Sequence, residues 1–166
     1  MTAAKSWTPM RSAAWALLAV VLFATLNLAA PRIAGAAPKK AKTIHRETVI
    51  SRSKYWVKKR VPYSQRRYFR GYRQDCSGFV SMAWRLGRSH TTRTLPRVAK
   101  RVPVKHAQPG DAVLSRGHAV IFAGWKNKSK RTFYAYAEPS WGGHAHKKVK
   151  KFKHGYKVLR RPGIQG

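Results

Sequence analysis

The chain has a single cysteine, Cys76, among 166 residues, and this limits how its fold can be held together. One thiol forms no intramolecular disulfide, so the folded state has to rest on side-chain packing. The composition supplies the material, because 43% of the residues are hydrophobic and they include 6 Trp, 7 Tyr and 6 Phe. We therefore expect one packed domain and no disorder over the whole length.

The amino-terminal segment has the pattern of an export signal. Lys5 and Arg11 precede the apolar run "SAAWALLAVVLFATLNLAA", and small residues follow in "IAGAA". This order is typical of a secretory signal cleaved after Ala36. We expect residues 1–36 to be a signal peptide, 37–43 a basic leader, and 44–166 one exported domain that is extracellular or associated with the cell wall. The apolar run also approaches the length that spans a bilayer, so an uncleaved membrane anchor is the alternative.

Two segments in the first half of the domain have helical character. Residues 45–61, "HRETVISRSKYWVKKRV", place Val49 and Trp56 at helical spacing, and Pro62 ends the pattern. Residues 75–87, "DCSGFVSMAWRLG", predict a second helix with Asp75 as N-cap and Gly87 as carboxyl-terminal stop. The single cysteine then lies in the first turn of this second helix.

From residue 110 onward the hydrophobic period changes. The runs "DAVLS", "HAVIFAGW", "RTFYAYAEP", "HKKVKKFK" and "YKVLRR" are short, rich in Val, Ile, Phe and Tyr, and separated by polar or glycine-containing breaks. Helices first and an antiparallel sheet second predict an α+β domain.

A symmetric register of the hairpin around the loop 126–130 predicts a polar pair at its open end. In this register Phe122 lies opposite Tyr134 and His118 lies opposite Glu138. Directly opposed residues of antiparallel strands share one face, with Cβ atoms about 4.5–5.5 Å apart. We therefore expect His118 and Glu138 to form a hydrogen bond, and a slip of one residue would separate them.

These residues suggest nucleophilic catalysis. The amides of a helix N-terminus and a nearby imidazolium can lower a thiol pKa from about 8.5 into the range of roughly 3.5–7.5. Cys76 would then be the nucleophile, with His118 as its base and later acid, Glu138 would orient the imidazole, and Asp75 would cap the helix. The alternatives are a packed thiol, a strand histidine and a solvated or ion-paired acid.

The motifs "DCSGFVSMAW", "QPGDAVL" and "GHAVIFAGW" resemble those of the NlpC-type cell-wall cysteine peptidases, a papain-like α+β superfamily, over residues 45–160. The resemblance implies hydrolysis of an amide bond in peptidoglycan stem peptides, with Cys76 attacking the carbonyl and its own backbone N–H helping to stabilise the oxyanion. It also implies that Tyr63 in "VPYSQ" lines the site and that Ser77 follows the nucleophile.

The sequence departs from that family in two places. The family more often has His, Asn or Gln as third member of the triad, where this chain offers Glu138, and His144 or His146 in "GGHAHK" could take this role instead. The glycine pair that commonly follows the family's "PY" is absent here. His144 and His146 share a strand face, but no second pair of zinc ligands accompanies them, so we expect neither a metal nor another cofactor.

Positive charge dominates the chain, with 36 Lys and Arg against 4 Asp and Glu. Such a surface attracts anionic wall polymers or lipid head groups by long-range electrostatics. Nucleic acid is not expected, because no nucleic-acid motif is present and the signal directs export. We therefore predict a monomeric, exported cysteine peptidase. The alternative function is a non-catalytic cationic binder of wall polymers or nucleic acid on a degenerate peptidase fold.

Overall fold

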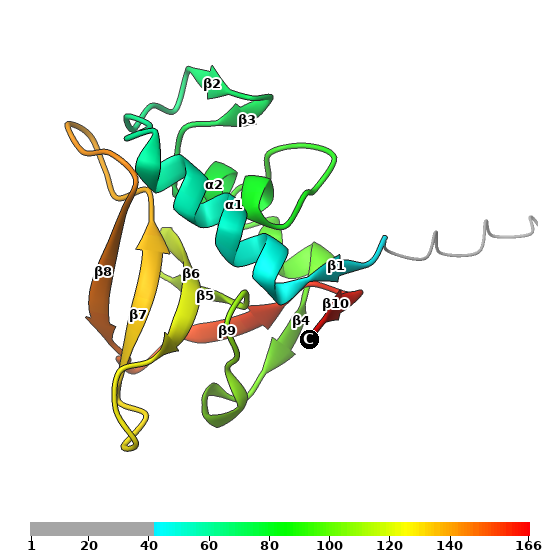
Figure 1. The fold of residues 1–166 in the computed structure, drawn as a ribbon, viewed down its shortest axis with the longest axis vertical. Coiled ribbons are helices and arrows are strands. Elements are labelled where there is room, and N and C mark those ends of the chain that lie inside the picture. The colour runs from blue at the N-terminus through cyan, green and yellow to red at the C-terminus, as the bar shows by residue number, and fades with distance from the viewer. Residues whose placement is uncertain (1–41) are drawn as a thin grey trace, which may run out of the picture. The chain divides into compact units, whose positions relative to one another are not determined.

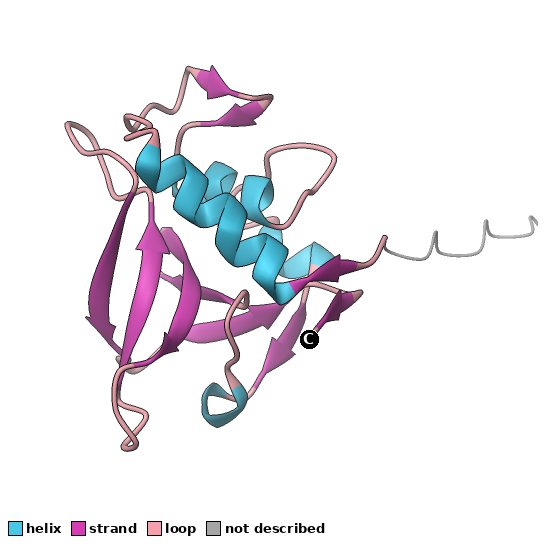
Figure 2. Cartoon of the chain, viewed as in Figure 1, coloured by secondary structure: helices cyan, strands magenta, loops and turns pink. Residues whose placement is uncertain are grey.

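The computed structural model describes residues 42–166, which form an α+β fold. A six-stranded antiparallel sheet has the order β4-β9-β5-β6-β7-β8. Figures 1 and 2 show both α-helices of these residues running beside the sheet. The helices are α1 (Arg46–Lys58) and α2 (Cys76–Ala83), and the sheet strands are β4 (Lys100–Val102), β5 (Ala112–Ser115), β6 (His118–Trp125), β7 (Thr132–Ala137), β8 (His146–Lys151) and β9 (Lys157–Arg160).

Smaller elements complete the fold. A parallel pair joins the two ends of the described chain, and a short hairpin follows α1. These elements are β1 (Ile44–His45) with β10 (Ile164–Gln165), β2 (Tyr68–Phe69) with β3 (Tyr72–Arg73), and the 3-10 turns Leu95–Val98 and Val104–His106.

The predicted signal peptide, residues 1–36, and most of the basic leader lie outside the described residues. The predictions for them therefore remain predictions. Within residues 42–166, none of the helices has the length and apolar character needed to cross a membrane.

The predicted order of helices before strands is confirmed for the six-stranded sheet, whereas the short strands β1, β2 and β3 precede α2. Each of the five predicted strand runs corresponds to one of the strands β5 to β9. The short edge strand β4 was not predicted, because three residues, "KRV", have too little pattern to indicate a strand.

The second helix is shorter than its sequence predicts, and Gly87 is not its stop. Helix α2 ends at Ala83, and Arg85 takes the left-handed conformation with φ 51°. The amide of Arg85 donates to Met82 O at 3.1 Å and that of Leu86 donates to Ser81 O at 3.0 Å, which is the Schellman pattern. The early end lets the buried Trp84 donate from Nε1 to Gly110 O at 2.8 Å.

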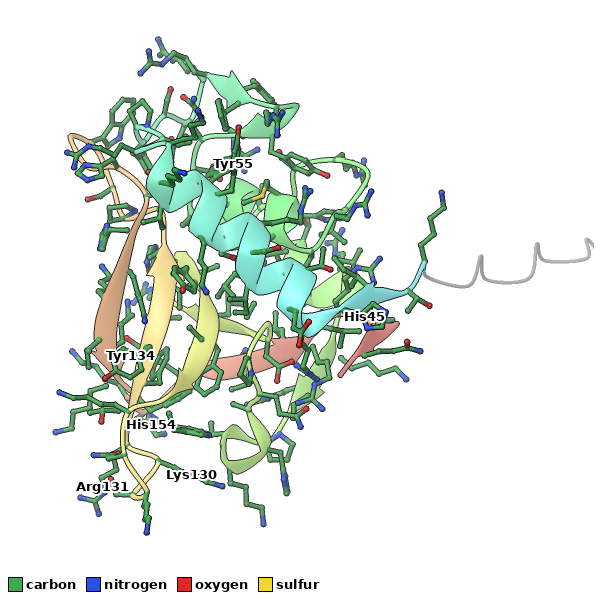
Figure 3. The ribbon with its side chains drawn as sticks, in the orientation of Figure 1. His45, Tyr55, Lys130, Arg131, Tyr134 and His154 are labelled. Carbon is green, nitrogen blue, oxygen red and sulfur yellow. The ribbon has the colours of Figure 1, made fainter. Side chains whose placement is uncertain are left out.

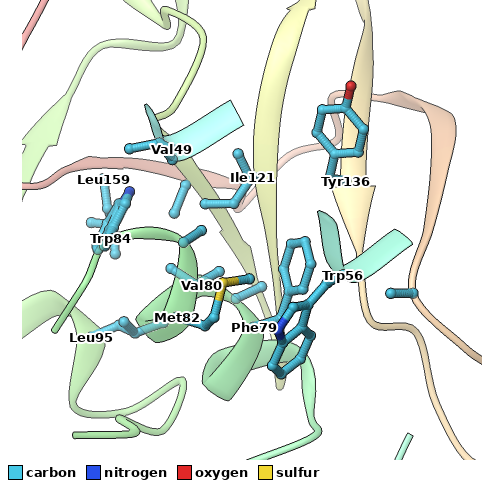
Figure 4. Close-up of a cluster of buried hydrophobic side chains, with 14 of the residues drawn as sticks. Val49, Trp56, Phe79, Val80, Met82, Trp84, Leu95, Ile121, Tyr136 and Leu159 are labelled. Carbon is cyan, nitrogen blue, oxygen red and sulfur yellow. The ribbon is translucent and has the colours of Figure 1, made fainter. Parts of the chain in front are cut away.

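The helices are held against the sheet by a buried apolar cluster (Figure 4). Trp56 from α1 meets Phe79 from α2 edge-on, with ring centroids 5.5 Å apart. Ile121 from β6 and Leu159 from β9 close the cluster from the sheet side. A second cluster contains Val120, Phe122 and other alternate positions of the strands, so each face of the sheet has its own apolar contacts.

A buried ionic cluster ties α1, β9 and the turn before β5 together. The fully buried carboxylate of Asp111 accepts from Arg46 Nη1 at 3.0 Å, from Arg160 Nε at 2.9 Å and from Arg160 Nη2 at 2.8 Å. It also accepts from the Gln108 amide at 2.9 Å, so it shapes its own turn as well. One acidic side chain thus satisfies donors from three separate segments.

Replacing Asp111→Asn should destabilise the fold strongly, because two buried or half-buried guanidinium groups would lose their counter-charge. The expected loss is about 3 kcal/mol of the free energy of unfolding, measured by urea denaturation. Glu47→Gln is the matched control, because Glu47 is exposed on α1 and its loss removes the same formal charge. The control should stay within about 0.5 kcal/mol of wild type. Equal losses for the two variants would contradict the role given to the Asp111 cluster.

Candidate active site

Cys76 is the first residue of α2, and Asp75 caps this helix as the sequence predicts. The Asp75 carboxylate accepts from the Gly78 amide at 2.6 Å and from Ser77 Oγ at 3.1 Å. Position 78 requires glycine, because a Cβ there would lie 1.9 Å from Arg73 O. Local contacts therefore fix the helix start that carries the cysteine.

Cys76 lines a cavity of about 360 Å³ together with other predicted site residues. Its Sγ lies 4.0 Å from Gly117 O, and Gly117 directly precedes His118. The cavity is lined by Tyr63, Gln65, Arg73, Asp75, Cys76, Ser77, Thr91, Thr92 and Gly117. A wider hollow of about 440 Å³ beside α1 contains none of the predicted site residues. The fold thus brings Tyr63, Asp75, Cys76 and Ser77 to one cavity.

The expected low pKa of the Cys76 thiol is wrong in direction. Burial raises the pKa of the Cys76 thiol above its ordinary value of 9.0, and the negative charge of Asp75 adds to the rise. Backbone amides of Ala119, Ser77 and Cys76 itself act in the opposite direction without outweighing burial. The resting group is therefore the neutral thiol.

The predicted hairpin register is also wrong. The loop closes with the Lys126 amide donating to Thr132 O at 3.0 Å, so Gly124 pairs with Tyr134. A β-bulge between Phe122 and Gly124 then shifts the register, and Phe122 pairs with Ala135 in place of Tyr134. Toward the open end this differs by one residue from the symmetric register, and such a slip exchanges the faces of opposed side chains.

His118 is the first residue of β6. Because side chains alternate along a strand, His118 lies on the same face of the sheet as Val120, and Ala119 lies on the other face. Burial, together with the charges of Lys150, Lys148 and His146, lowers the pKa of His118 to about 4. Its imidazole is therefore neutral at pH 7 and able to accept a proton.

Glu138 lies fully buried just after β7, and the expected hydrogen bond to His118 is not formed. Neither carboxylate oxygen of Glu138 has a hydrogen-bond partner among the described residues. Burial and the nearby charge of Asp75 raise the pKa of Glu138 to about 8. The bulge explains the separation, because it changes which residues of β6 and β7 face one another.

Of the two histidines that could replace Glu138, His146 is the one whose charge acts on His118. Its Nδ1 makes a hydrogen bond at 2.9 Å with His144 O. Among residues 42–166, no group of three His, Cys, Asp or Glu side chains has an arrangement that could hold a metal ion.

Sequence reasoning missed Arg73, which supports the start of α2. Its guanidinium forms an ion pair with Asp75 and donates from Nη2 to Ser77 Oγ at 3.2 Å and to His90 O at 3.0 Å. It also missed Trp141, which is largely exposed and meets the Tyr63 ring edge-on at 5.7 Å. The contact of Trp141 with Tyr63 spans 78 residues, so the motif around the cysteine gives no signal for it. Arg73 lies only two residues before Asp75, and this position next to the N-cap is the signal that could have found it.

Comparison with solved structures supports the fold. The chain is similar to Rv1477, a hypothetical invasion protein of Mycobacterium tuberculosis, with 20% identity and a TM-score of 0.50. It is equally similar to the Resuscitation Promoting Factor Interacting protein RipA, in structures with a mutated cysteine or a mutated histidine. Each match covers 70% of this chain and 61% of the other, so the chain spans about three fifths of the solved chains. No family model and no curated protein matches the sequence.

Because its pKa is raised, the Cys76 thiol should react slowly with iodoacetamide at neutral pH. We expect the alkylation rate of the folded chain to increase about tenfold per pH unit and to keep rising beyond pH 9. The rate is followed by intact-protein mass spectrometry, with the urea-unfolded chain as reference for a solvated thiol. A plateau below pH 8 in the folded chain would show a depressed thiol pKa and contradict this account.

The buried Glu138 should make stability depend on pH between about 4.5 and 8. Its pKa is raised on folding, so its favourable contribution is complete below about pH 4.5 and is lost as the pH rises through about 8. As the pH rises from about 4.5 to 8, the free energy of unfolding of wild type should therefore fall relative to that of Glu138→Gln. The expected fall is at least about 1.4 kcal/mol, the equivalent of one pKa unit.

Urea unfolding at several pH values measures this difference, with Glu47→Gln as the control for the loss of an exposed carboxylate. A constant difference between wild type and Glu138→Gln from pH 4.5 to 8 would show that Glu138 ionises normally in the folded chain.

Proposed function

We propose that this chain is an exported cysteine peptidase that hydrolyses an amide bond in peptidoglycan stem peptides. The observation that carries the proposal is Cys76 at a capped, buried helix start, where its Sγ faces a polar cavity beside the residue that precedes His118. The sequence resemblance to NlpC-type peptidases and the similarity of the fold to RipA support it. RipA was studied with its own cysteine or histidine mutated, which fits the pair of residues proposed here.

In this mechanism the resting site holds a neutral thiol and a neutral imidazole. His118 takes the proton from Sγ as the sulfur attacks the scissile carbonyl, and the Cys76 backbone N–H donates to the oxyanion. The imidazolium then gives its proton to the leaving amine, and water hydrolyses the thioester with His118 again as base. The mechanism requires the His118 ring to come within hydrogen-bond distance of Sγ in the substrate complex.

The shifted pKa values of His118 and Cys76 are compatible with this chemistry. A histidine with its pKa lowered to about 4 is unprotonated at neutral pH, so almost every molecule carries the base in its active form. The raised pKa of the thiol means that the proton moves during attack and is not lost beforehand. Within this proposal the orienting role falls to His146, whose charge acts on His118, and His146→Gln should lower kcat. Glu138→Gln should not act through this role, because Glu138 makes no hydrogen bond to His118.

One observation favours a second candidate, a non-catalytic cationic binder of wall polymers. The raised thiol pKa is unlike that of a preformed thiolate nucleophile, whereas the formal charge of +32 supplies affinity for anionic polymers by itself. In either case we propose an exported protein that acts at the cell wall as a monomer without a cofactor.

Mass spectrometry of peptidoglycan fragments distinguishes the two candidates. Purified fragments are incubated with the wild-type chain and with Cys76→Ala at the same salt concentration. We expect new stem-peptide products with wild type alone, and the product masses identify the cleaved bond. Ser81→Ala is a matched control, because it changes a buried residue of the same helix away from the cavity.

The peptidase proposal fails if neither wild type nor Cys76→Ala releases a product. Equal sedimentation of both proteins with cell walls, lost as salt is raised, would then establish the binder.

A further inference from the structure

The acidic residues leave one end of the sheet without any negative charge. Asp75 pairs with Arg73, Asp111 pairs with Arg46 and Arg160, and Glu138 is buried. The fourth acid, Glu47, lies on α1. Apart from Glu138, residues 112–166 contain no carboxylate side chain. Apart from Arg160, which pairs with Asp111, the cations of this part therefore form no ion pair within the described residues.

Eight basic side chains gather where the β6–β7 loop meets the end of β8, and we call this surface the cationic pole. The Phe152 amide donates to Arg131 O at 2.9 Å, and Lys130 Nζ donates to Lys105 O at 3.3 Å, so the loops are adjacent. Figure 3 shows Lys130, Arg131 and His154 at this end. The pole consists of the exposed side chains of Lys126, Lys128, Lys130, Arg131, Lys151, Lys153, His154 and Lys157.

The charges of the cationic pole are uncompensated within the described residues. The ion pairs of residues 42–166 involve Arg46, Arg73 and Arg160, none of which belongs to the pole. The neighbouring Lys150 is affected by this crowding, because burial and then the charges of Lys148 and Lys153 lower its pKa. Like charges held together on a folded surface give a strong, salt-dependent attraction for a polyanion.

The surroundings of the pole distinguish between kinds of polyanion. Its aromatic neighbours are packed on one another, with Phe152 centroids 4.3 Å from Phe133, 5.3 Å from Trp125 and 6.2 Å from Tyr156. They are therefore not free to stack on nucleic-acid bases. The exposed large apolar side chain beside the pole is Val149, two residues before Lys151 on β8, and one valine is far less apolar surface than an inserting helix face supplies. A base-free polymer of phosphates fits this surface best.

We propose that the cationic pole binds a single-chain phosphodiester polymer without bases, of the kind represented by poly(glycerol phosphate). The pole lies at the end of the sheet away from α2 (Figure 1), so polymer and peptide would be held at separate places. The proposal concerns binding and does not depend on hydrolysis by Cys76.

The test measures binding of fluorescently labelled poly(glycerol phosphate) to full-length Cys76→Ala by anisotropy at several salt concentrations. One variant carries Lys126→Gln, Lys128→Gln, Lys151→Gln and Lys153→Gln. The control carries Lys54→Gln, Lys58→Gln, Arg66→Gln and Arg67→Gln, which removes the same charge from exposed positions on α1 and before β2. Thermal unfolding verifies that both variants are folded. If the fourfold pole variant does not fold, the double variant Lys128→Gln with Lys153→Gln replaces it as the fallback variant.

For the pole variant we expect the slope of log affinity against log salt concentration to become less steep by about 3. Each lost contact between a cation and a phosphate of a single chain reduces the slope by about 0.7, and this variant loses four cations. The fallback variant should lose about 1.4, and the control less than 1. Equal decreases for the pole variant and the control would overturn the proposal, because binding would then follow net charge alone. Tighter binding of double-stranded DNA or of vesicles with phosphatidylglycerol, at equal phosphate concentration, would overturn the choice of polymer.

Discussion

The buried carboxylate of Asp111 is the interaction on which the arrangement of this fold depends most. It satisfies Arg46 at the start of α1 and Arg160 on β9, and it accepts the Gln108 amide in the turn before β5. In a chain with four acids and 36 basic residues, a carboxylate used this way is unavailable anywhere else. Because β5 leads directly into β6, the same cluster helps to set where Gly117 O meets Cys76 at the start of α2.

Two of the other three acids, Asp75 and Glu138, are also buried. Asp75 satisfies the Gly78 amide and Arg73 at the start of α2, and Glu138 is buried near it without a partner of its own. The result is a separation of roles within the domain. Three of the four carboxylates, those of Asp75, Asp111 and Glu138, are buried, whereas most cations remain on the surface with few counter-charges. This separation explains how a chain with a formal charge of +32 can still pack an apolar core around Trp56 and Trp84.

Much of the fold could be predicted from the sequence, because its determinants are local. Asp75 as N-cap, the apolar faces around Val49 and Trp56, and the five short β runs each depend on residues close in the chain. The register of β6 and β7 was missed because it depends on where the loop closes and on a bulge at Gly124, whose φ is 134°. A glycine inside a strand pattern is the one local signal of such a bulge. The end of α2 was missed for a similar reason, since burial of Trp84 against Gly110 outweighs the preference for glycine at the cap.

The same distinction applies to the chemistry of the candidate site. The sequence places Cys76 at a helix start, and a helix N-terminus alone would lower the thiol pKa. Burial of the thiol depends on the packing of α2 against the sheet, which the motif does not contain, and it reverses the direction. The cationic surface then becomes relevant, because Lys148 and Lys150 on β8 help to keep His118 neutral. The resting thiol and the resting imidazole are therefore both neutral at pH 7. The positive charge of this domain therefore works against a preformed thiolate–imidazolium pair, because it disfavours the charged imidazolium.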